Sequence, residues 1–496
     1  MNRPYSWQNG GLSRVLIPRS WHGLTQSSRS IAATVMLTAA TAAGAATVIN
    51  PIVVLVACVA AVATVAITSP AARFAIVVAG GLLVFRSSDQ LDASKSAYLM
   101  WVGVSTALAI AHLAKHRTDR DAADIRPLLL ASAGLVAAIV LSLVVALLSG
   151  TPFVDWIRDA APYGLLAVSP FLAWDGARSR LGSRMEAIAV AAGLMASVAF
   201  SVEWLGRRGL ADLPFATLGS SSGMLSALAF AVATGAILSR RPRRLLWVMV
   251  AAAVFTLMLI TGTRSALVFL VVPVAMVFAH GQRFTRAGRL AGASFLVGLA
   301  GLALAFLAFQ AGLIDVVRLT ERLGSIVSLG SNLAADQSFI ERATQVGVAS
   351  SAFAGSPVLG VGLGFRFEWV QFGGGSFPSY TIDTGLSIAA KFGLIGLGLF
   401  GIATSAVFAF YRRLRLRLPE HVRLTFVGFA AVSIAMLPLG NPFEDKGFGL
   451  AVAILVAWGL ASARTARTNP TPVAEMRSRT PGSPQIRTAS QQVAPT

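Results

Sequence analysis

Two arginines lie beside long apolar runs of the sequence, where few charges are expected. Arg264 belongs to the turn Thr261–Ser265 between two such runs, and Arg342 lies in the first turn of a helix predicted over 339–353. A guanidinium has five N–H donors in a fixed fork, which suits the oxygens of a phosphate or diphosphate. Both are therefore candidates for binding an anionic group. The alternatives are snorkelling to lipid headgroups for Arg264 and a salt bridge within the helix for Arg342.

Asp383 and Lys391 form a second candidate pair. They are eight residues apart at the start of an apolar run, which places them roughly on one side of a helix. The spacing is compatible with a structural ion pair. It is also compatible with Asp383 acting as a general base.

The glycine-rich segment 356–364 (SPVLGVGLG) comes between these candidates. Glycine-rich loops can cradle phosphates, but no strand–turn–helix unit surrounds this one. We therefore expect its backbone to pack closely on neighbouring helices, as glycine permits.

The composition indicates which elements must position these residues. The 496 residues are 55% hydrophobic and 12% charged, with a mean hydropathy of +0.71, which excludes an ordinary soluble protein. The one cysteine excludes an intramolecular disulfide and a cysteine-based zinc site. A membrane needs about 20 apolar residues per helical span. The predicted runs are 31–49, 51–68, 71–85, 97–114, 127–149, 162–174, 185–204, 221–238, 245–261, 265–280, 290–310, 383–410, 424–439 and 443–461.

These runs predict an all-α, polytopic integral membrane protein with about 14 (12–14) transmembrane helices and one long extracytoplasmic loop. The expected organisation is a cytoplasmic arm (1–30), helices 1–11 (31–311), the loop (312–382), helices 12–14 (383–461) and a disordered cytoplasmic tail (462–496).

The net charge of +20 follows the expected topology. Most of the 41 basic residues fall on one set of alternating segments, which the positive-inside rule assigns to the cytoplasm together with both termini. The basicity is thus topogenic, and we expect no nucleic-acid partner. Arg158, Arg207, Arg264 and Arg342 fall on the outer side, while charge inside the spans is almost confined to Lys391. The outer face is therefore the expected working face.

The chain resembles the O-antigen ligase and O-antigen polymerase superfamily, most strongly over residues 256–400. The resemblance rests on the order and spacing of several loose motifs around one outer loop. These are Leu259–Leu267, Arg342 ahead of 356–364, Asp383–Leu386 leading to Lys391–Gly396, and the small-residue turn 218–222 with Arg207 and Arg208 upstream.

The resemblance implies a metal- and cofactor-independent glycosyltransferase of the bacterial cytoplasmic membrane. Its partners would be an undecaprenyl-diphosphate-linked glycan, an acceptor glycan, membrane lipid and other envelope assembly proteins. Arg264 and Arg342 would hold the diphosphate, and Arg158 and Arg207 are further candidates for contacting it.

The sequence departs from the ligases of this superfamily at the position of the catalytic base. Ligases of the family place a catalytic histidine before the span that follows the loop, where this chain has Ile382 and Asp383. All five histidines lie in or near the expected cytoplasmic segments. Asp383 is therefore the candidate base, and a polymerase is favoured over a ligase.

Two other functions are compatible with the sequence. One is a lipid-linked glycan flippase or polysaccharide exporter, and the other is a non-enzymatic subunit of an envelope assembly complex. Transporters usually have charged residues at mid-membrane and broken helices. The near absence of charge in the predicted spans favours the transferase.

Overall fold

The computed structural model describes residues 64, 67–84, 93–207, 222–260, 268–279, 337–370, 376–380, 382, 384–438 and 440–468. The chain divides into two compact units, Met1–Ser69 and Pro70–Thr496. Every element below belongs to the second unit.

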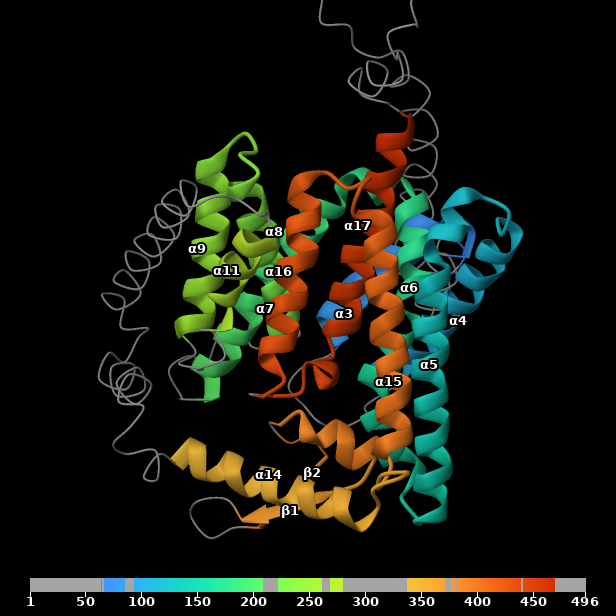
Figure 1. The fold of residues 1–496 in the computed structure, drawn as a ribbon, viewed down its shortest axis with the longest axis vertical. Helices are drawn as coiled ribbons and strands as arrows, with labels where there is room; N and C mark the ends of the chain where they lie inside the picture. The colour runs from blue at the N-terminus through green and yellow to red at the C-terminus, as the bar shows by residue number, and fades with distance from the viewer. Residues whose placement is uncertain are drawn as a thin grey trace, which may run out of the picture. The chain divides into compact units, whose positions relative to one another are not determined.

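This unit is mostly helical, with one small sheet (Figure 1). The α-helices are α3 (Pro70–Val84), α4 (Ala93–Lys115), α5 (Arg120–Leu148), α6 (Phe153–Arg178), α7 (Met185–Arg207), α8 (Gly223–Leu238), α9 (Arg244–Ile260), α11 (Val271–Ala279), α14 (Gln337–Gly355), α15 (Leu386–Leu414), α16 (Glu420–Met436) and α17 (Phe448–Thr468). Two 3₁₀ helices, η1 (Arg180–Arg184) and η4 (Pro442–Glu444), and the strands β1 (Phe367–Val370) and β2 (Ser376–Ser379) complete the described elements.

Each predicted apolar run that falls within the described residues coincides with a helix. The runs at 31–49 and 290–310 lie outside these residues, as does nearly all of 51–68. Within the described part of the chain, five helices are long and apolar enough to cross a membrane: α4, α5, the η1–α7 segment, α15 and α17. Helices α3, α8 and α9 are apolar but shorter. A membrane protein is thus supported, while the total of about 14 spans stays a prediction.

Helix α6 differs from its prediction. It has 26 residues and begins at Phe153, whereas the apolar run suggested a short span over 162–174. The charged residues Asp155, Arg158 and Asp159 therefore belong to its first two turns rather than to a loop. An average of hydropathy over a window does not assign such charged residues to an apolar helix. In the structure, their partners on neighbouring elements stabilise them there. Helix α6 packs against α3, α4, α5 and α17, so most of its surface is covered by protein.

Ion pairs between helices gather at one end of this unit, which we call the basic end. It contains the turns 116–119, 179–184, 239–243 and 415–419. The pairs join Arg73 to Asp175 (2.7 Å), Arg178 to Asp119 (2.7 Å), Arg241 to Glu186 (2.6 Å), and Arg417 and Arg467 to Asp124 (2.9 and 2.6 Å). They hold together segments that are far apart in the sequence.

The opposite end, which we call the loop end, carries α14 and the antiparallel hairpin β1–β2 (Figure 1). The hairpin pairs Phe367 with Ser379 and Val370 with Ser376. Helix α14 packs on β1 and on the first turns of α15 through a small apolar cluster around Ala349, Phe367 and Ala390. The described part of the predicted outer loop is therefore folded onto the helices.

Candidate functional site

The structure describes only some of the predicted site residues. Arg264 and Asp383 lie outside the described residues, so their predicted roles are untested. Arg207 is the last residue of α7, and its side chain is also outside the description. Arg158 and Arg342 are described and lie on α6 and α14. Both of these helices reach the loop end.

The glycine-rich segment 356–364, here called the glycine loop, packs tightly on the helices. Gly360, Gly362 and Gly364 have φ values of 74°, 84° and 81°, which side-chain-bearing residues rarely adopt. A Cβ on Gly364 would lie 2.7 Å from the backbone nitrogen of Trp156, and one on Gly360 would overlap the backbone of Lys391. The prediction of close backbone packing is confirmed.

Helix α15 is broken where the glycine loop meets it. Gly393 has a φ of 61° and a ψ of −169°, which interrupts the helical hydrogen bonds. The glycine loop supplies hydrogen bonds that replace the interrupted ones. Val361 N donates to the Ala390 carbonyl (2.8 Å), Gly362 N to the Lys391 carbonyl (3.0 Å), and Leu394 N to the Pro357 carbonyl (2.8 Å). The break is therefore stabilised by backbone pairing, as an interruption in an apolar environment requires.

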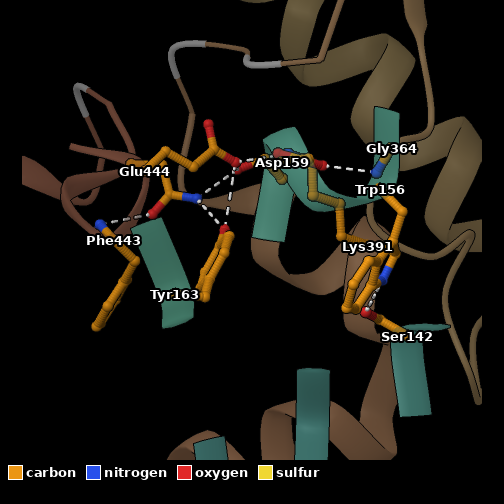
Figure 2. A network of polar contacts seen from close by, with 10 residues as sticks. Ser142, Trp156, Asp159, Tyr163, Gly364, Lys391, Phe443 and Glu444 are labelled. Atoms are coloured by element: carbon orange, nitrogen blue, oxygen red, sulfur yellow. Dashed lines mark hydrogen bonds and ion pairs between the residues drawn. The ribbon is translucent and has the colours of Figure 1, made fainter. Parts of the chain in front are cut away.

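Lys391, directly before this break, is fully buried and joins two acids (Figure 2). Its Nζ lies 2.7 Å from Asp159 Oδ1 and 2.9 Å from Glu444 Oε1, and the three side chains are 0%, 2% and 7% exposed. The second oxygen of Asp159 accepts a hydrogen bond of 2.9 Å from Gly364 N. One ion-pair network thus connects α6, α15, η4 and the glycine loop.

Neutral groups surround the Glu444 carboxylate. Tyr163 Oη and Ser387 Oγ each donate to Glu444 Oε1 at 3.3 Å, and Asn441 Nδ2 donates to both hydroxyl oxygens at 3.1 and 2.9 Å. Figure 2 shows that the other Glu444 oxygen has none of these contacts. The network holds two acids for one lysine, so a proton on Glu444 would balance its charge.

The network corrects one expectation from the sequence and adds partners for Lys391. The structure joins Lys391 to Asp159 and Glu444, which are 232 and 53 residues away in the sequence, while the ion pair with Asp383 stays a prediction because Asp383 lies outside the described residues. Charge inside the spans was expected to be almost confined to Lys391, yet Asp159 and Glu444 are buried beside it. A helix period reveals neighbours on one helix only, whereas these contacts arise from the packing of separate elements.

Arg158 lies over the ring of Tyr380, with its Cζ 3.8 Å from the ring centroid. Arg366, which directly precedes β1, lies 5.2 Å from the same centroid and forms a 2.9 Å ion pair with Asp155. Asp159, the other acid near Arg158 in the sequence, is occupied by Lys391. Both neighbouring acids bind cations from other elements, although Asp155 also interacts electrostatically with Arg158.

Arg342 lies in the second turn of α14, because this helix begins no later than Gln337. The argument from the helix dipole is therefore weaker than the sequence indicated. Its side chain is partly exposed. Within the described residues it has no ion pair or hydrogen bond, so the suggested salt bridge within the helix is not found there.

The described residues contain no cluster of three or more His, Cys, Asp or Glu side chains able to hold a metal ion.

Asp445, which directly follows Glu444, has a structural position. It accepts hydrogen bonds from Ser222 Oγ (2.7 Å) and from Met224 N (3.0 Å) at the start of α8. The groups suited to chemistry at the loop end are therefore guanidinium groups and carboxylates.

No protein-family model matches the chain, and no curated protein matches it significantly in sequence.

Proposed function

We propose that the protein is a membrane glycosyltransferase that polymerises or ligates undecaprenyl-diphosphate-linked glycan units in surface polysaccharide synthesis, with polymerisation favoured. The observation that carries the proposal is the pair Arg158 and Arg342. Both are partly exposed at the loop end, and neither forms an ion pair within the described residues. Guanidinium groups that are accessible and not already paired with an acid suit an anionic substrate.

In the proposed reaction, a hydroxyl of the acceptor glycan attacks the anomeric carbon of the donor. The bond from this carbon to the diphosphate oxygen breaks, and undecaprenyl diphosphate leaves with the electron pair. Negative charge therefore develops on the diphosphate, where positioned arginines stabilise the transition state. Arg264 and Arg342 are the proposed catalytic contacts. Asp383 is the proposed base for the hydroxyl proton.

Arg264 is compatible with the same end of the molecule. The start of α8 is joined to Asp445 at the loop end, and α9 returns antiparallel after the turn 239–243. Helix α9 therefore runs toward the loop end and finishes at Ile260, four residues before Arg264. We further propose that the loop end faces outward and the basic end faces the cytoplasm, because arginines concentrate at the basic end.

A lipid-linked glycan flippase or exporter is the second candidate, and one observation favours it. A helix broken beside a buried charge is a common feature of transporters, and α15 has both. Lys391, however, is only five residues from the start of α15, about 7–8 Å along the helix axis. This depth is closer to the loop end than to the middle of a span.

The test uses cells in which the natural gene is replaced by variants. Arg264→Ala and Arg342→Ala should abolish or shorten the surface polymer while membrane levels of the protein are unchanged. The matched control is Arg413→Ala, which removes an exposed arginine from the opposite end of α15. Chain length is measured by gel electrophoresis of the extracted polymer.

Two outcomes would contradict the proposal. Polymer of normal length in both variants would show that Arg264 and Arg342 are not needed for the reaction. In cells that lack the gene, single repeat units should remain on the lipid carrier at the outer leaflet. Their accumulation only at the inner leaflet would identify a flippase.

A further inference from the structure

We propose that Arg158 and Arg366, gathered on Tyr380, form a diphosphate-binding subsite, and that Asp155 occupies part of it until the ligand binds. The inference rests on the proposed function, because it identifies the donor diphosphate as the ligand. It adds Arg366, Tyr380 and Asp155 to the residues that the sequence singled out. Asp155 is the new element, as an internal competitor of the substrate.

The first argument is the gathering of two like charges. Both guanidinium carbons lie within 5.2 Å of one ring centroid, although they come from α6 and from the end of the glycine loop. Two cations beside one ring repel each other unless anions accompany them, and Asp155 interacts electrostatically with both. Asp155 is the one carboxylate that forms an ion pair with them in the described part of the chain. The cluster therefore has a surplus positive charge.

The second argument is that the fold keeps Arg158 free of Asp159. This carboxylate is one residue away in the sequence, yet both of its oxygens are occupied by Lys391 and by Gly364 N. Lys391 is thus a positioning residue for the subsite. It withdraws the acid that would otherwise be the nearest partner of Arg158.

The third argument concerns donors and access. The N–H donors of a guanidinium lie in its own plane, so contact with the Tyr380 ring leaves them directed outward. No hydrogen bond from Arg158 is found within the described residues. The Arg366 side chain is 55% exposed, and Arg158 is partly exposed. A ligand from solution can therefore reach both guanidinium groups.

The chemistry favours a diphosphate over a single carboxylate. A carboxylate presents two oxygens, and Asp155 binds one nitrogen of Arg366 through one of them. A diphosphate presents oxygens on two phosphorus atoms and more negative charge, which suits two forks. We therefore expect the diphosphate to displace Asp155 from Arg366 and to bind Arg158 as well.

The experiment measures binding to the purified full-length protein in detergent by isothermal titration calorimetry. The probes are farnesyl diphosphate, a short prenyl diphosphate, and inorganic pyrophosphate. Arg158→Ala and Arg366→Ala should each weaken both probes about tenfold or more, the usual effect of losing a hydrogen bond to a charged group. Arg413→Ala at the basic end is the control and should bind as the unmodified protein does.

Asp155→Asn gives the sharpest result, because its expected effect has the opposite sign. The amide keeps the shape of the side chain but removes the competing charge, so both probes should bind severalfold more tightly. A purely structural role of Asp155 predicts no gain in affinity. Melting temperatures of all variants, measured in the same detergent, separate lost binding from lost folding.

Several results would overturn the subsite. These are unchanged affinity in Arg366→Ala, no gain in Asp155→Asn, and no binding of either probe to the unmodified protein. Displacement of farnesyl diphosphate by an equal mole fraction of phosphatidylglycerol in mixed micelles would identify a site for lipid headgroups instead.

The subsite and the proposed function can fail separately. If the binding results hold but cells without the gene still make full-length polymer, the proposed function fails. If Arg264→Ala and Arg342→Ala abolish the polymer but Arg366→Ala binds both probes normally, the subsite fails.

Discussion

The basic end and the loop end use the same residue types in different ways. At the basic end, Asp124 receives arginines from two other segments, and Arg178 and Arg241 each bind one acid on another segment. At the loop end, Asp159 and Glu444 are buried around Lys391, and Asp155 is bound to Arg366. Arg158 and Arg342 have no such partner within the described residues. The paired arginines of the basic end join separate segments, whereas Arg158 and Arg342 at the loop end are open to a ligand.

Burial explains part of this difference. The arginines that bind Asp124 are 41% and 31% exposed, so solvent screens these ion pairs and each contributes modestly to the free energy of unfolding. The Lys391 side chain is fully buried, and removing one partner of such a pair leaves a charge without compensation. The Lys391 network should therefore be more sensitive to substitution than the half-exposed ion pairs of the basic end, whereas the buried pair Arg73–Asp175 at that end should behave like the network.

The largest effect is expected for Lys391→Met. This change leaves Asp159 and Glu444 buried without their cation and should reduce the free energy of unfolding by about 3–5 kcal/mol. Thermal unfolding of the purified protein in detergent measures the loss. The control is Lys391→Met combined with Glu444→Gln, which removes one of the two acids and should recover part of the stability. Equal melting temperatures for Lys391→Met and the unmodified protein would contradict the role assigned to this network.

A smaller effect is expected where the glycine loop meets the broken helix. Gly360→Ala adds a Cβ at a φ of 74°, against the backbone of Lys391, and should cost about 2 kcal/mol or more. Gly398→Ala, on the broken helix α15, is the control. It has nothing within 4 Å of the added Cβ, and alanine should stabilise the helix by up to about 1 kcal/mol. Thermal unfolding should shift in opposite directions for the two variants. A shift in the same direction would show that the loop does not constrain the break.

The sequence predicted the helices better than it predicted their contacts. Apolar runs indicated α4, α5, α15 and α17, and glycine spacing indicated a tightly packed loop at 356–364. The start of α6 was predicted too late, because its charged first turns resemble a loop when hydropathy is averaged. The position of the α15 break depends on hydrogen bonds from the glycine loop, so the sequence of α15 alone does not specify it.

The candidate site was predicted only in part. The counting of outer arginines identified Arg158 and Arg342, since insertion into the membrane does not require charges there. Arg366 was not identified, because its significance comes from Tyr380, which lies 14 residues later in the sequence. The bridge from Asp159 to Glu444 was also missed, since it depends on the packing of α6, α15 and η4. Helical spacing reveals the neighbours of a residue on its own helix but not those on other elements.

The smallest effect is expected at the basic end, where Asp119 binds Arg178 in an exposed turn. The hydrogen bond from Arg178 holds the pKa of Asp119 below its ordinary value of 3.8. An acid with a lowered pKa stabilises the fold above the pKa it has when unfolded, and this contribution is lost as the pH falls through the folded value. Asp119→Asn should therefore change the melting temperature little at pH 7 and slightly reduce its fall below about pH 4. A loss at pH 7 as large as that of Lys391→Met would show that exposure does not separate the Asp119–Arg178 pair from the buried Lys391 network.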